Sequence, residues 1–131
     1  MGINEIIEIS KPRIVVLLVI TAVTSMYAAS KLVPGSPPLE YLDYLHIIIA
    51  GALASAGSSA LNHYYDKDID PKMSRTSSRP IPSGRMAASN VLLYGLAVSC
   101  ISVIYGFFAL NAISAFFIAV GIFSYVIIYT V

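Results

Sequence analysis

Three long stretches of the chain contain no charged residue. Asp, Glu, Lys and Arg are absent from residues 14–30, 44–65 and 86–131. A helix needs about 20 apolar residues to cross the hydrocarbon core of a bilayer, so the first two stretches each hold one span and the longer third holds two, with a turn at Asn111. The pattern predicts an all-α fold, a polytopic transmembrane helical bundle. Its four spans are expected at residues 12–30, 44–66, 88–109 and 112–131.

The composition agrees with a membrane protein. Of the 131 residues, 57% are hydrophobic and only 11% are charged, whereas soluble domains carry roughly 25% charged residues. The net charge of +1 and the acidic start of the basic loop give no sign of nucleic-acid binding. Cys100 is the single cysteine, which excludes a disulfide framework and a cysteine metal site. A cleaved signal peptide is the alternative for the first span, but the run is long for one and no clean A-x-A site follows.

The basic residues predict how the chain is oriented in the membrane. Of the eight lysines and arginines, only Lys31 lies in the loop between the first and second expected spans. The others precede the first span or lie between the second and third. The positive-inside rule therefore places the N-terminus and the loop of residues 67–85 in the cytoplasm.

Three polar residues end the second expected span, in the sequence LNHYYDKDID. Asn62, Asp66 and Asp70 are spaced four apart, so they lie on one face of a helix, and Pro71 is expected to end that helix at Asp70. Carboxylates at the negative end of a helix repel each other and need a positive partner. Such oxygen ligands suit Mg²⁺, which typically takes one or two carboxylates plus water and phosphate oxygens. Asp68 points away from this face and is expected to support the ligands or to lie at the surface.

Small residues continue the same face back along the span. Ala50, Ala54 and Ser58 keep the spacing of four, and small residues at this spacing let neighbouring helices approach closely in lipid. The second span should therefore lie at the centre of the bundle, with its polar end facing an internal cavity.

The loop that follows, PKMSRTSSRPIPSGR, carries cations that could bind phosphate. Arginine matches phosphate oxygens in a bidentate way, which favours Arg75 and Arg79, with Lys72 nearby. Lys11, before the first span, could approach the same group. Arg85, close to the third span, is expected mainly to set topology.

An ion-pair cluster without catalytic function is the alternative explanation of this region. Lys67, Lys72 and Arg75 would then simply neutralise the acids at the membrane surface. The complete line of Asn62, Asp66 and Asp70 makes this alternative less favourable than a metal site.

Three segments together resemble a known family. The N-x-x-x-D-x-x-x-D pattern at residues 62–70, the KMSRTSSRPIPSGR loop at residues 72–85 and the SKPRIVVLL start at residues 10–18 are similar to those of UbiA-type intramembrane prenyltransferases. The loop and the KPR start are most similar to the protoheme IX farnesyltransferases, also called heme O synthases. The resemblance covers the whole chain but only the first part of the family pattern, which has about nine spans and two Asp-rich motifs.

The resemblance implies a reaction and a set of ligands. Asn62, Asp66 and Asp70 match the positions that hold Mg²⁺ against an allylic diphosphate, and Arg75 and Arg79 would neutralise the leaving diphosphate. The substrates would be farnesyl diphosphate and heme B, whose vinyl group becomes the hydroxyethylfarnesyl side chain of heme O. No Asp or Glu follows Asp70, so we expect the chain to be an incomplete piece that needs a C-terminal half or a second copy.

Several alternatives remain open within this interpretation. The acceptor could be an aromatic quinone precursor or a lipid, because the metal site would be the same. The chain could also be a non-catalytic membrane subunit or fragment. His63 is a candidate heme ligand because imidazole commonly binds iron, although a packing role is favoured because it lies one residue off the metal-facing line. His46 is expected at the opposite interface.

Overall fold

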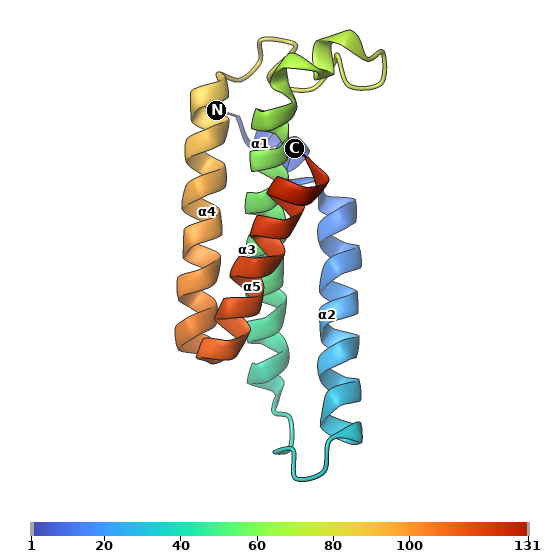
Figure 1. The fold of residues 1–131 in the computed structure, drawn as a ribbon, viewed down its shortest axis with the longest axis vertical. Coiled ribbons are helices and arrows are strands. Elements are labelled where there is room, and N and C mark those ends of the chain that lie inside the picture. Colours follow the sequence, from blue (N-terminus) through green and yellow to red (C-terminus); the bar gives the residue numbers. More distant parts are fainter. Residues whose placement is uncertain (1, 131) are drawn as a thin grey trace.

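The computed structural model describes residues 2–130 and is helical throughout, which confirms the all-α prediction. The elements are α1 (Ile3–Ser10), α2 (Pro12–Leu32), α3 (Tyr41–Tyr65), the 3₁₀ turns η1 (Asp66–Asp68) and η2 (Asp70–Lys72), α4 (Ala88–Ala109), α5 (Ala112–Ser124) and the π-helix η3 (Tyr125–Tyr129). A short turn joins α4 to α5, whereas α3 and α4 are joined by the longer segment of residues 66–87, which begins with two 3₁₀ turns (Figure 1).

Three of the helices are long and apolar enough to cross a membrane. They are Pro12–Leu32, Tyr41–Asp68 and Ala88–Ala109. The fourth expected span is shorter: its apolar helix covers Ala112–Ile128, and Val131 lies outside the described residues. The chain turns between α4 and α5 at Asn111, whose side chain caps α5 by accepting a hydrogen bond of 2.8 Å from the backbone N–H of Ser114.

Helix α3 lies at the centre of the bundle, as its small residues predicted. It packs against α1, α2, α4 and α5 (Figure 1). The contact with α4 is close because Gly57 lies against Ser99, where a Cβ atom would come within 2.8 Å of the backbone nitrogen. Nearby, the buried Ser102 of α4 donates a hydrogen bond of 2.9 Å to the carbonyl oxygen of Ala50. Small side chains thus bring the two helices together over much of their length.

The short helix α1 precedes the first span and was not expected from the sequence. Its Ile9 is fully buried against Ala60, Met86 and Val91. Lys11 separates α1 from α2 in the left-handed region, with φ of 50° and ψ of 67°. Pro12 begins α2, where its missing N–H costs nothing and its ring disfavours a helical Lys11. The chain therefore bends sharply at Lys11.

The polar parts of the chain gather at one end of the bundle. Figure 1 shows α1, the segment 66–87 and η3 near the same end, and the connection of residues 33–40 at the other. The exposed surface between the ends is rich in large apolar side chains such as Leu17, Ile101 and Phe117. This arrangement suits a bundle that is surrounded by lipid and has one polar mouth.

Candidate active site

The last turn of α3 differs from the expected geometry. The α-helix ends at Tyr65 rather than continuing to Asp70, and Asp66 and Asp70 lie in successive 3₁₀ turns. Short polar side chains such as aspartate favour turns over helix interiors, and Pro71 occupies the first turn of η2, where no N–H is needed. The expected end at Pro71 was therefore wrong by about one helical turn.

Arg79 supplies the positive charge that the two carboxylates need. Its Nη1 donates to both oxygens of Asp70, at 2.8 and 2.9 Å, and lies 3.6 Å from Oδ2 of Asp66. The carboxylates therefore face the same side despite the change of helix type. The Asp70 residue is only 2% exposed, and a charge buried to this degree requires a partner. Lys67 pairs instead with the exposed Asp68, at 3.5 Å.

A second cation reaches the site from the other end of the sequence. Nζ of Lys11 donates a hydrogen bond of 2.6 Å to Oδ1 of Asn62. Nδ2 of Asn62 then donates to Oδ2 of Asp66 and to Oγ1 of Thr130, each at 3.0 Å. Burial lowers the pKa of Lys11 below its usual value, and the neighbouring Arg79 lowers that pKa further.

These side chains line a cavity of about 390 Å³ at the polar end of the bundle. The lining includes five of the residues singled out from the sequence: Lys11, Asn62, Asp66, Arg75 and Arg79. Asp70 does not line the cavity but accepts a hydrogen bond from Arg79, which does. Lys72 is exposed in η2 and does not line the cavity either. The lining also includes Ile14, Thr76 and Tyr125, which no motif in the sequence indicated.

The oxygen-bearing groups of Asn62, Asp66 and Asp70 have the chemistry of ligands for a hard divalent cation, and in this structure they are paired with Lys11 and Arg79. Within residues 2–130, no group of three His, Cys, Asp or Glu side chains lies close enough to form a closed metal site. A site built from an amide and two carboxylates suits Mg²⁺, which keeps water and phosphate oxygens among its ligands.

An apolar cavity of about 350 Å³ adjoins the polar one. It lies between α2, α3 and α5 and is lined by small and apolar side chains from Gly51 to Ser59 of α3 and their neighbours. Ile14 and Tyr125 line both cavities, so the two meet there. From Gly51 to Ser59 the helix rises about 12 Å, so the lining of the apolar cavity extends over about two turns of α3.

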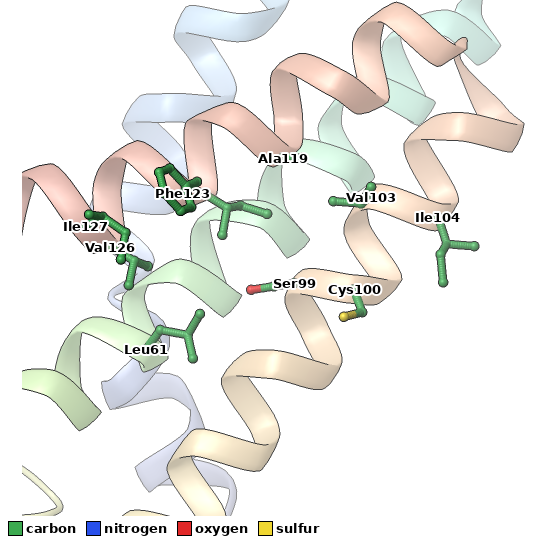
Figure 2. Close-up of a pocket in the computed structure, with 10 residues that line it drawn as sticks. Leu61, Ser99, Cys100, Val103, Ile104, Ala119, Phe123, Val126 and Ile127 are labelled. Carbon is green, nitrogen blue, oxygen red and sulfur yellow. The ribbon is translucent and has the colours of Figure 1, made fainter.

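Another apolar cavity lies on the other side of α5. Figure 2 shows it between α4 and the α5–η3 segment, with Phe123 and Val126 opposite Val103. It holds about 410 Å³, and none of the charged residues of the polar cavity lines it. It is therefore separate from the candidate site.

The two histidines lie apart from the cavity lining. His63 is 2% exposed, and neither of its ring nitrogens has a hydrogen-bond partner in the described part of the chain. Nδ1 of His46 forms a hydrogen bond of 2.7 Å with the hydroxyl of Tyr105, near the start of α3. Their positions favour the packing and interfacial roles expected for these residues.

Comparison with known families identifies the class of protein to which the chain belongs. Residues 18–131 match the model of the UbiA prenyltransferase family, and the chain belongs to this family. It is 68% identical over 130 residues to protoheme IX farnesyltransferase 1 of Cenarchaeum symbiosum (strain A), covering 99% of this chain and 44% of that protein.

Other relatives carry the same name. The chain is 38% identical to protoheme IX farnesyltransferase of Pyrobaculum neutrophilum, covering 98% of this chain and 44% of the relative. It is 43% identical to that of Rhizobium etli, covering 97% of this chain and 38% of the relative. The chain therefore spans less than half the length of these curated relatives. No solved structure matches the chain.

Proposed function

We propose that this chain forms the diphosphate-binding part of an enzyme that transfers a farnesyl group from farnesyl diphosphate to a vinyl group of heme B, giving heme O. The junction of the two cavities at Ile14 and Tyr125 is the observation that carries this proposal. A polar headgroup fits among the charged side chains, and an isoprenoid tail fits between α2, α3 and α5. Relatives named protoheme IX farnesyltransferase support the choice of substrates.

In the proposed reaction, Asn62, Asp66 and Asp70 hold Mg²⁺, which neutralises charge on the leaving diphosphate when bound. Arg75 and Arg79 bind the diphosphate oxygens, and Lys11 supplies a further positive charge from the opposite side. Preorganised cations of this kind stabilise charge that develops in the transition state. Within residues 2–130, Arg79 contacts Asp66 and Asp70 through Nη1 alone. Its Nε and Nη2 groups therefore remain to bind phosphate.

The covalent step replaces a C–O bond with a C–C bond. The bond between C1 of the farnesyl group and the diphosphate breaks, and its electron pair leaves with the diphosphate. The allylic cation bonds to the terminal carbon of the heme vinyl group. Water then adds to the remaining cationic carbon and loses a proton, which leaves the hydroxyl group. The apolar cavity keeps water away from the first cation until the vinyl group reacts.

The orientation of the chain in the membrane completes the proposal. The polar cavity would open to the cytoplasm, where farnesyl diphosphate can enter from water, and the tail would extend into the bilayer. The distribution of lysine and arginine supports this orientation, since Lys31, in the last turn of α2, is the only one of the eight near the opposite end.

The test is product formation by the full-length polypeptide that the gene encodes. With Mg²⁺, farnesyl diphosphate and heme B, we expect heme O, and we expect Asp66→Asn to lose this activity while still inserting in the membrane. Product formation from an aromatic quinone precursor instead of heme would assign a different acceptor. An Asp66→Asn variant with unchanged kcat would contradict the metal site.

A further inference from the structure

Arg85 forms a fork of hydrogen bonds at the edge of the candidate site. Its Nη1 and Nη2 donate to the two carboxylate oxygens of Glu8, at 2.8 and 3.1 Å. Nη2 also donates to the carbonyl oxygen of Ser78, at 2.6 Å, and Nε donates to Oγ of Ser83, at 3.0 Å. A charge placed only to set membrane topology would need none of these partners.

The loop side of this fork is connected to Arg79. Ser78 directly precedes Arg79, and Oγ of Ser83 donates a hydrogen bond of 2.7 Å to the carbonyl oxygen of Arg79. Arg85 thus bonds to Ser78 and Ser83, which lie on either side of Arg79 in the sequence. This arrangement fixes the backbone from which Arg79 reaches the acids.

The other side of the fork is connected to Lys11. Glu8 lies three residues before Lys11, and the backbone N–H of Lys11 donates a hydrogen bond of 3.3 Å to the carbonyl oxygen of Glu8. A non-glycine residue in the left-handed region is strained, so the surroundings of Lys11 must hold it there. Buried Ile9 and the hydrogen bond of 3.1 Å between the hydroxyls of Ser10 and Tyr94 provide part of this support.

We propose that Arg85 is a positioning residue of the active site, and that its ion pair with Glu8 fixes Lys11 and Arg79 relative to each other across the diphosphate cavity. The proposal rests on the proposed function for what the cavity binds. Exposed ion pairs contribute little to stability, and both side chains here are 41% exposed. The expected effect of breaking this pair is therefore on the placement of the two cations rather than on folding.

The experiment compares variants of the full-length polypeptide in lipid nanodiscs. Arg85→Lys keeps the positive charge but loses the fork, and Glu8→Gln removes the charge of the partner. Glu5→Gln is the matched control, because Glu5 lies on the same short helix and acts on Arg85 through its charge alone, whereas Glu8 also accepts hydrogen bonds from Arg85. Thermal unfolding of each variant checks that the fold is retained.

Two measurements are made on each variant. The first is the KM for farnesyl diphosphate. We expect this KM to rise about tenfold in Arg85→Lys and in Glu8→Gln, with little change in kcat. A change of this size is at the lower end of those caused by removing residues that orient metal ligands. The double variant should be no worse than either single one, because both changes break the same connection. The second is the rate at which an amine-reactive reagent acylates Lys11, with Lys67 as internal reference, which should increase in both variants.

The outcomes separate this proposal from the proposed function. If Arg85→Lys and Glu8→Gln keep the wild-type KM and the wild-type acylation rate of Lys11, the positioning role is wrong while the transferase proposal stands. If the wild-type protein neither turns over nor binds farnesyl diphosphate, the proposed function is wrong, and the acylation rates still decide whether Arg85 places Lys11. If Arg85→Lys fails to fold, Glu8→Gln gives the same test.

Discussion

Nζ of Lys11 donates a hydrogen bond of 2.6 Å to Oδ1 of Asn62, although the two residues lie on separate elements and 51 positions apart in the sequence. This bond joins the start of α2 to the end of α3 at the mouth of the polar cavity. It directs the oxygen of the amide toward a cation and leaves its nitrogen to Asp66 and Thr130. The side chain of Asn62 is thus held with its oxygen toward Lys11 and its nitrogen toward Asp66.

The lowered pKa of Lys11 predicts an alkaline loss of diphosphate affinity. The pKa is lowered first by burial and then by Arg79 and Arg75, against the opposing effect of Asp66 and Asp70. As pH rises through this pKa, which lies below the usual 10.5, the ammonium loses its charge and the affinity should fall. The measurement is calorimetric titration with a farnesyl thiodiphosphate analogue and Mg²⁺ across this pH range.

Stability should change in the opposite direction over the same pH range. Between the pKa of Lys11 in the folded protein and 10.5, the unfolded chain binds more protons than the folded one, so the contribution of Lys11 to the free energy of unfolding rises with pH. Lys11→Met should remove both trends, while Lys67→Met should keep them. An affinity that falls equally with pH in Lys11→Met would assign the loss to another group.

Removing Arg79 should destabilise the protein strongly. Arg79→Met leaves the carboxylate of Asp70, whose side chain is 3% exposed, without its cation, and breaking such a buried pair costs about 3–5 kcal/mol. Adding Asp70→Asn should recover part of this loss. By contrast, Asp66→Asn should cost less than about 1 kcal/mol, because Asp66 is 25% exposed and lies 3.6 Å from Arg79. Denaturant unfolding in detergent measures all three, and equal costs for Arg79→Met and Asp66→Asn would contradict the geometry.

The close contact between α3 and α4 predicts a difference between two glycines. A Cβ atom at Gly57 would lie 2.5 Å from Oγ and 2.8 Å from the backbone nitrogen of Ser99, so Gly57→Ala should push the helices apart and cost about 1–3 kcal/mol. At Gly51 the nearest atom would be Cγ2 of Val19, at an ordinary 3.7 Å. Gly51→Ala should therefore be neutral or slightly stabilising. If both variants unfold alike, α3 and α4 do not pack as described.

The sequence predicted the long helices well because lipid demands uninterrupted apolar segments, which are visible in the order of residues. The group of Asn62, Asp66 and Arg79 could also be predicted, because Asn62 and Asp66 are four residues apart and Arg79 lies in the loop that follows them. Three contacts could not be predicted from sequence spacing, because each joins distant parts of the chain. They are the contacts of Asn62 with Lys11 and with Thr130, and that of Arg85 with Glu8. Arg85 in particular carries no local sign of its partner Glu8.

The apolar cavity predicts how prenyl chain length can be changed. Gly51 lines the end of this cavity farthest along α3 from Asn62, and a Cβ atom there would meet only an ordinary contact with Val19. Gly51→Leu should therefore shorten the cavity without disturbing the polar site. We expect the kcat/KM for farnesyl diphosphate to fall at least tenfold while that for geranyl diphosphate, which is one isoprene unit shorter, stays within about threefold. Measuring both substrates with one enzyme preparation controls for folding, because misfolding would lower both rates together. Unchanged kcat/KM for both substrates would show that the tail does not lie between α2, α3 and α5.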